Sequence, residues 1–181
     1  MHAYSQPLPL TAFNVASLQG NDLSLYKEIV EIRRASNGPR HPKTLNALSL
    51  VAQLMQDHGE LEEAEPLARE AEASWRAVLG PFHEDTLVAT SNLAQLLTAR
   101  GKYDEAEPIA RRAVDVAKSV MGKDARDTLV ALSNLAQTLA AQEKFEEAEP
   151  LMRQDLATSL SLLVSRGASR AGTLSLASSV R

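Results

Sequence analysis

The sequence predicts an all-α fold, a solenoid of about seven antiparallel helices stacked as helix-turn-helix pairs. The first observation is a Glu-Ala-Glu-Pro motif that recurs every 42 residues and ends at Pro66, Pro108 and Pro150. The second is the spacing of apolar residues between these motifs, which follows the i, i+3, i+4, i+7 rule of amphipathic helices. The third is composition, because aromatic residues make up only 4% while alanine and leucine dominate. Strands favour β-branched and aromatic residues, so this composition suits helices packed on helices.

The repeat divides the chain into units that align without insertions. Residues 86–108 and 128–150 are identical at 16 of 23 positions. A helix pair of this length cannot bury its apolar face alone, and about three stacked units make a stable array. We therefore predict, in chain order, an irregular extension (1–20), a capping half-repeat helix (21–42, helical over Asn21 to Ser36), repeat 1 (43–83), repeat 2 (84–125), repeat 3 (126–166) and a tail that is disordered by composition (167–181).

Each repeat begins with a first helix that a glycine ends. In repeat 2 this helix is predicted over Glu84 to Arg100, and Gly101 follows it as a residue free to adopt a positive φ. Gly59 has the same place in repeat 1. Repeat 3 has Glu143 there, so its turn must form without glycine, at some energetic cost.

The second helix of repeat 2 is predicted from Tyr103 to about Met121. Asp104 is the expected N-cap. Pro108 is expected in the first turn, where backbone N–H groups have no partner within the helix. Acidic residues crowd the start of the helix and basic residues follow, which is the order that the helix dipole favours.

Charge and composition exclude several classes of function. The net charge is −4 and the pI is about 5.6, unlike the basic surface of a nucleic-acid-binding protein. The chain has no cysteine, which excludes disulfides, thiolate catalysis and zinc sites built from cysteine. No apolar run approaches the length of a membrane span, and the N-terminal sequence has no secretory signal pattern. We expect a cytoplasmic, intracellular protein without membrane insertion.

The repeat resembles a known family at specific residues. The segment from Gly101 to Pro108, followed by Arg112-Ala113, is similar to the tetratricopeptide signature. The joints, Leu79 to His83 and Gly38 to Pro42, more narrowly resemble those of the 42-residue repeats of kinesin light chains. The resemblance implies a right-handed superhelix whose first helices line a concave groove. Repeat 3 departs from the pattern at Ala125-Arg126, which replace the His-Pro pair of the joint.

The predicted groove is a neutral row of amide and hydroxyl groups. The candidate partner-binding residues are Asn46, Ser49, Gln53, Ser91, Asn92, Gln95, Ser133, Asn134 and Gln137, and Gln56, Val88 and Val130 extend the same rows. Amide groups both donate and accept hydrogen bonds, so they can pair with a peptide backbone of any sequence. No Lys or Arg stands at these positions, and we expect no capture of acidic C-termini. The alternative interpretation is a solvated face that repeats because the units arose by duplication.

Other residue groups have structural explanations. His41 and His83 recur at the joints without further metal ligands nearby in sequence, so we interpret them as turn residues. Trp75 is expected to pack between units. The Glu-rich motifs look like paired acids for general acid-base catalysis, but they recur at every second helix, which indicates a structural role. No phosphate-binding loop or nucleophile elbow is present.

These features predict a protein-protein interaction scaffold that binds a peptide or protein segment in the groove, and not an enzyme. The alternative is a structural subunit of a larger, multi-subunit complex, held through its convex face and its ends. We expect no cofactor, no metal and no nucleic-acid partner.

Overall fold

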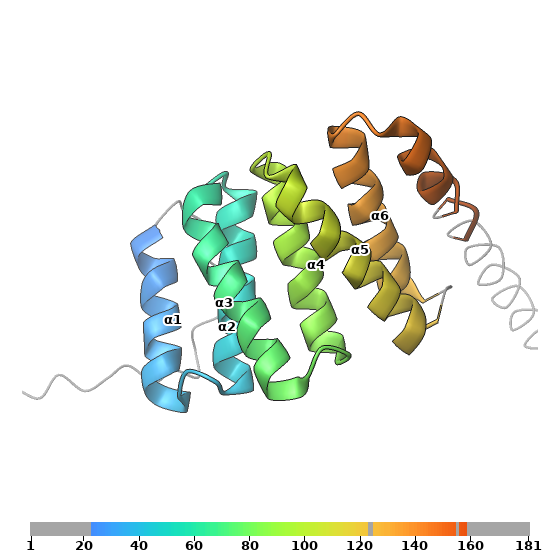
Figure 1. The fold of residues 1–181 in the computed structure, drawn as a ribbon. Coiled ribbons are helices and arrows are strands. Elements are labelled where there is room, and N and C mark those ends of the chain that lie inside the picture. Colours follow the sequence, from blue (N-terminus) through green and yellow to red (C-terminus); the bar gives the residue numbers. More distant parts are fainter. Residues whose placement is uncertain (1–22, 123–124, 155, 159–181) are drawn as a thin grey trace, which may run out of the picture.

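The computed structural model describes residues 23–122, 125–154 and 156–158. Its labelled helices are α1 (Leu23–Asn37), α2 (Pro42–Asp57), α3 (Leu61–Leu79), α4 (Glu84–Ala99), α5 (Tyr103–Val120) and α6 (Arg126–Ala141). Residues 145–154 and 156–158 are also helical (Figure 1). The predicted all-α solenoid is confirmed, since every regular element in these ranges is a helix. The predicted extension (1–20) and tail (167–181) lie outside the described residues. Within the described part, no helix is both long and apolar enough to cross a membrane.

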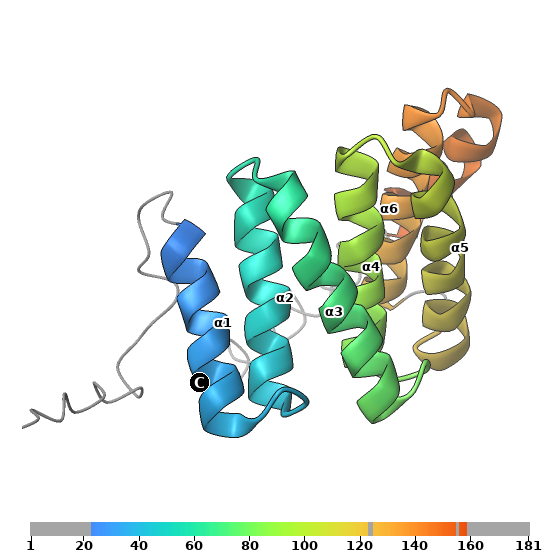
Figure 2. The ribbon, with the colours of Figure 1, turned by 60° about the vertical axis from the view of Figure 1, so that its left-hand side comes forward.

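The helices alternate between two layers. Figure 1 looks onto the layer of the second helices, α3 and α5, and Figure 2 shows the stack turned so that α1 and α2 come forward. Each labelled helix packs on the next one in the chain. In addition, α2 contacts α4 and α4 contacts α6, whereas α3 and α5 have no Cα atoms within 8 Å of each other. The first helices therefore lie closer together and form the inner side of the array.

The core follows the predicted apolar faces. The first-helix positions predicted to be apolar in repeat 2 are all buried: Leu87, Thr90, Leu93, Ala94 and Leu97. Full burial of a leucine side chain contributes roughly 1.5–3 kcal/mol, so three such residues per helix dominate its stability. Trp75 is buried in the same cluster as Ala89 and Leu93 of the next unit, which confirms that it packs between units.

The turns inside the repeats share one backbone conformation. Gly101 has a φ of 73°, as its position after the first helix of repeat 2 predicted. Glu143 has a φ of 63° at the equivalent place in repeat 3 and is the one non-glycine residue of the described chain with a positive φ. A side chain in this left-handed region costs roughly 1–2 kcal/mol. Repeat 3 therefore keeps the geometry of the turn and bears the strain.

Two predictions about the second helices are wrong. Lys102, and not Asp104, is the N-cap of α5, and no side chain caps this end. The Lys102 N–H donates to the Leu97 carbonyl over 2.9 Å, and its own carbonyl accepts from Ala106, so backbone bonds of the turn fix where α5 starts. Pro66 and Pro108 are each the sixth residue of their helix, beyond the first turn. Each helix continues through its proline with one backbone hydrogen bond missing.

The first and third joints are closed by a threonine side chain as well as by the backbone, whereas at the second joint the Thr86 hydroxyl has no hydrogen-bond partner among the described residues. The hydroxyl of Thr44 donates to the carbonyl of Gly38 over 2.8 Å, and that of Thr128 donates to the carbonyl of Gly122 over 2.7 Å. Each glycine lies in the turn after a second helix, or after α1, and each threonine lies in the first turn of the next first helix. This bond ties the start of each of these first helices to the end of the preceding helix.

The two joint histidines are turn residues, as predicted. His41 precedes α2 and His83 precedes α4, and each is the N-cap of its helix. The Nδ1 atom of each ring accepts a hydrogen bond from the backbone N–H two residues later, over 3.2 Å. These bonds satisfy one of the N–H groups that a helix start leaves without a partner.

Candidate partner-binding surface

The predicted groove residues lie on the first helices, and their exposure varies with position. The exposed ones are Asn46, Gln53, Gln95 and Gln137. The half-buried ones are Ser49, Asn92, Ser133 and Asn134. Ser91 is buried, at 7% exposed. α4 contacts a first helix on both sides, whereas α2 and α6 each contact only one among the labelled helices. The glutamine row, Gln53, Gln95 and Gln137, is thus exposed in all three repeats, whereas the serine row is not.

The structure brings several predicted residues together between repeats 1 and 2. A shallow pocket between α2 and α4 is lined by Ser49, Gln53, Gln56 and Asn92, above small residues of α3. The Ser49 hydroxyl is buried and has no hydrogen-bond partner among the described residues. A buried polar group left unpaired costs about 1–3 kcal/mol. A ligand group that reached this hydroxyl would recover part of that free energy.

Apolar side chains on the same helices add to this surface. Leu50, Val88 and Val130 are large hydrophobic residues that remain exposed. The two valines belong to the predicted rows, but Leu50 was missed because it stands where the other repeats have Asn92 and Asn134. The strict 42-residue register was the signal that could have found it. The inner side is therefore a mixed surface of amides and aliphatic groups.

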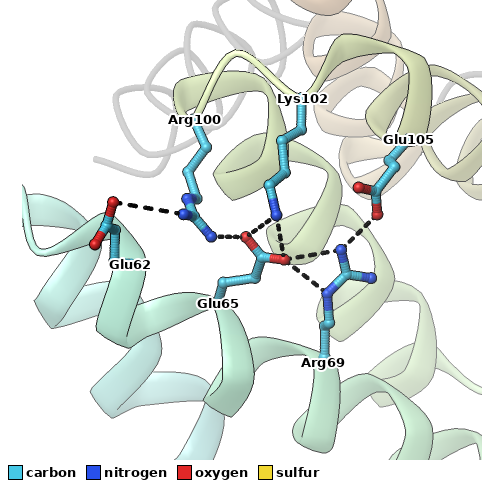
Figure 3. Close-up of polar contacts among 6 residues, drawn as sticks. All are labelled: Glu62, Glu65, Arg69, Arg100, Lys102 and Glu105. Atoms are coloured by element: carbon cyan, nitrogen blue, oxygen red, sulfur yellow. Dashed lines mark hydrogen bonds and ion pairs between the residues drawn. The ribbon is translucent and has the colours of Figure 1, made fainter.

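Charged side chains also join repeats 1 and 2. We use the name Glu65 cluster for Glu65 and its three cationic partners, Arg69, Arg100 and Lys102 (Figure 3). Lys102 Nζ lies 2.9 and 3.0 Å from the two carboxylate oxygens of Glu65, and Arg69 Nε donates to Glu65 Oε1 over 2.9 Å. Arg100 donates to Glu65 Oε2. Since Arg100 and Lys102 flank the turn of repeat 2, the cluster joins it to the second helix of repeat 1.

The environment of Glu65 strongly favours the ionised carboxylate. Burial raises the pKa of Glu65, but hydrogen bonds from Lys102, Arg69 and Arg100 outweigh it and lower the pKa to about 2. Outside the cluster, Arg69 also donates to Glu105 over 2.5 Å, and Arg100 lies 3.8 Å from Glu62. The carboxylate is therefore charged and fully engaged at neutral pH.

The same arrangement recurs one repeat later in a weaker form. A hydrogen bond from Lys144 lowers the pKa of Glu107; burial raises it, and bonds from Arg111 and Gln142 lower it further. Gln142 stands where repeat 2 has an arginine, so this copy has one cation fewer. Arg111 also reaches Glu147 over 2.6 Å, which parallels the outer contact of the Glu65 cluster.

These contacts explain the acidic motifs that resemble paired catalytic acids. A general acid needs a proton to give near neutral pH, and a carboxyl group with a pKa of about 2 has none. Glu65 and Glu107 instead pair with cations of the following repeat. Among the described residues, no group of three or more histidine or acidic side chains could hold a metal ion.

Comparison with known proteins agrees with this architecture. A family model described as tetratricopeptide repeat matches residues 23–77, 59–119 and 85–159. No curated protein sequence matches the chain. Two crystal structures of nearly identical TPR-like repeats, named after a kinesin light chain of Podosopora anserina, align with TM-scores of 0.68 (22% identity) and 0.66 (23%). BtubC (BKLC) from P. vanneervenii aligns with a TM-score of 0.67 at 17% identity. The alignments cover 77% of this chain but only 66%, 66% and 56% of those chains.

Proposed function

Because the chain belongs to the tetratricopeptide repeat family, we propose that it binds a segment of a partner protein along the inner face of α2, α4 and α6. Helical repeat arrays typically use extended concave surfaces for binding. The observation that carries the proposal is the pocket between α2 and α4, where Ser49, Gln53 and Asn92 come together and the Ser49 hydroxyl has no partner among the described residues.

The chemistry of this face favours a neutral, extended or helical segment. Gln53, Gln95 and Gln137 are exposed 42 residues apart, and each amide both donates and accepts hydrogen bonds. Apolar side chains exposed on the same helices are Leu50, Val88 and Val130. Backbone groups of a bound segment would pair with the amides, and its small apolar side chains would cover the aliphatic ones. The row has no cation to hold a carboxylate, so the partner's charge contributes little.

The test is an affinity purification from the native source with quantitative mass spectrometry. The groove variant changes Asn92 and Asn134 to leucine, and the control variant changes Ser119 and Gln154, on the second helices, to leucine. We expect a partner to be depleted with the groove variant and retained with the control. Both variants must keep the wild-type circular dichroism spectrum and melting profile, so that depletion reports on the surface and not on folding.

A binding measurement then gives the effect a magnitude. The segment of the partner that binds is synthesised as a labelled peptide and titrated with each variant by fluorescence anisotropy. Loss of two amide groups that each pair with the peptide removes about 1–3 kcal/mol, which raises Kd by about 5- to 150-fold. A groove variant that binds within about twofold of the wild type would contradict the proposed site.

The alternative function is that of a structural subunit held through the convex face and the ends. One observation favours it: Val78, Leu79 and Phe82 are exposed at the joint between α3 and α4, away from the inner face. In the same purification, this alternative predicts a fixed set of proteins that co-purifies equally with the wild type and the groove variant.

A further inference from the structure

The first two joints between repeats lie along one edge of the array. The first joint leads from α1 into α2 and the second from α3 into α4, and both turns lie at the lower edge of Figures 1 and 2. Both joints keep the glycine and the histidine that the turn uses, Gly38 and His41 in the first joint and Gly80 and His83 in the second. Residues that differ between equivalent places, 42 positions apart, are therefore not required by the turn itself.

One of these places carries opposite charges in the two joints. Lys43 lies in the first turn of α2 and is exposed, and Asp85 has the equivalent place in α4. Lys43 forms no ion pair among the described residues. Within the same part of the chain, the only ion-pair contact of Asp85 is with the His83 ring, 3.5 Å away, and the Asp85 side chain remains 48% exposed. Both charges are therefore accessible to a partner.

A second place is complementary in a different way. Phe82 at the second joint is 63% exposed, and the equivalent residue of the first joint is the exposed Arg40. The guanidinium group of Arg40 has no ion-pair partner in the part of the chain that the structure describes. An arginine side chain is attracted to the face of an aromatic ring, and both residue types are enriched at protein interfaces. The edge therefore carries two complementary pairs, and the members of each pair occupy equivalent places.

We propose that two copies of the chain associate antiparallel along this edge, with the first joint of each copy against the second joint of the other. A two-fold axis that crosses the edge between the two joints exchanges them, so each residue approaches its counterpart, 42 positions away, in the second copy. Lys43 then meets Asp85 of the second copy, and Arg40 meets Phe82 of the second copy. Symmetry makes each contact twice, because a two-fold interface uses the same surface on both copies. A second copy fits this edge because its complementary groups stand at places that such an axis brings together.

Other registers of the two copies bring like charges together. Asp127 has the place of Asp85 in the first turn of α6. An axis between the second and third joints would set Asp85 against Asp127 of the second copy, and an axis through the second joint would set Asp85 against itself. An axis through the first joint would oppose two copies of Lys43. Like charges that face each other weaken association, so the charges at this place favour the pairing of the first joint with the second.

Sedimentation velocity on the full-length chain tests the proposal. Exposed charge pairs contribute little individually, so the measurement extends from about 5 µM to about 0.5 mM. We expect a reversible equilibrium between monomer and dimer. Asp85→Lys opposes Lys43 with a like charge twice in each dimer and should raise the dimer Kd at least about tenfold. Adding Lys43→Asp to the same chain reverses both charges and should restore the wild-type Kd to within about threefold.

Asp127→Lys is the matched control, because it makes the same change of charge at the same place of a helix that the proposed contact does not use. It should leave the dimer Kd within about twofold of the wild-type value. Circular dichroism spectra and melting profiles of all variants must match those of the wild type, so that a change in Kd reports on the surface.

Three results would overturn the proposal. In the first, the wild-type chain remains a monomer over the whole concentration range. In the second, Asp85→Lys weakens the dimer no more than Asp127→Lys does, so another surface holds the copies together. In the third, the double reversal does not restore the dimer, so Lys43 and Asp85 do not meet. The first result needs no variant, and none of the three depends on whether the groove binds a peptide.

Discussion

Replacing Glu65 by glutamine tests whether the Glu65 cluster holds repeats 1 and 2 together. The Glu65 side chain is 9% exposed, and glutamine preserves its shape while removing the charge. A pKa of about 2, against an ordinary value of 4.5, corresponds to about 3 kcal/mol of stabilisation at neutral pH. We expect Glu65→Gln to lower the free energy of unfolding by about 2–3 kcal/mol, since the amide oxygen can still accept one hydrogen bond.

The repeat supplies matched controls for this substitution. Glu107 and Glu149 occupy the same register, with side chains that are 17% and 62% exposed. Glu107→Gln should have a smaller effect, because Glu107 has one cationic partner fewer. Among the described residues, Glu149 forms an ion pair only with Arg153, over 2.6 Å, at the surface. Exposed pairs contribute little, so Glu149→Gln should change stability by less than about 0.5 kcal/mol.

The effect of Glu65→Gln should depend on pH in a defined direction. The folded pKa of Glu65 lies below its unfolded value, so its contribution is present above about 4.5 and is lost as the pH falls toward 2. The difference in stability between wild type and Glu65→Gln should therefore be constant from about pH 6 to 8. This difference in stability should become progressively smaller below about pH 4.5, the ordinary pKa of a glutamate.

Urea unfolding, followed by circular dichroism and by Trp75 fluorescence, measures these differences. Urea is preferred to guanidinium because it is uncharged and does not screen the cluster. The two probes must give coincident transitions, since repeat arrays can unfold in parts. The reasoning fails if Glu65→Gln costs less than about 1 kcal/mol near pH 7, if Glu149→Gln costs as much, or if the difference does not narrow in acid.

Two further predictions concern the turn of repeat 3 and the inner face. Glu143→Gly should stabilise the protein by about 1 kcal/mol, because glycine adopts the observed φ of 63° without strain. Gly101→Ala, the matched control, should destabilise the protein by a similar amount. A lower urea midpoint for Glu143→Gly, or a higher one for Gly101→Ala, would contradict the assignment. Peptide binding to the inner face should change by less than about threefold in Kd between about 0.05 and 0.5 M salt, since the groove rows are neutral. A steep salt dependence in the anisotropy titration would instead locate binding on a charged surface.

The 42-residue period predicted most of the fold because each position has nearly the same environment in every repeat. Leu45, Leu87 and Leu129 are buried alike, so one apolar pattern sufficed for three first helices. Helix starts were harder to predict. Asp104 has the residue type of an N-cap, but the backbone bond from Lys102 to Leu97 closes the turn first. Local residue preference cannot show that a turn has already fixed the first helical residue.

The inner face was predictable in outline and not in accessibility. Ser49, Ser91 and Ser133 occupy one register, yet only Ser91 is buried, because its helix has first-helix neighbours on both sides. The partners of Glu65 were also beyond sequence reasoning. Arg69 is four residues away on the same helix, but Lys102 lies 37 residues later. Such a pair becomes visible only when the angle between two repeats is known.

The proposed binding residues and the residues of the Glu65 cluster are different, so their effects on binding and on stability can be separated by experiment. Asn92 lies on the inner face of α4, and Arg100, which follows the same helix, belongs to the Glu65 cluster. If the cluster only stabilises the fold, Glu65→Gln and Asn92→Leu should have additive effects on the free energy of binding and on the free energy of unfolding. Additivity is expected for sites without shared partners. If the cluster also sets the angle between α2 and α4, Glu65→Gln should weaken the binding of a peptide that spans both helices. The binding of a peptide that contacts α6 alone should not change. A double-mutant cycle on Kd distinguishes these cases, because only the second requires a coupling term between Glu65 and Asn92.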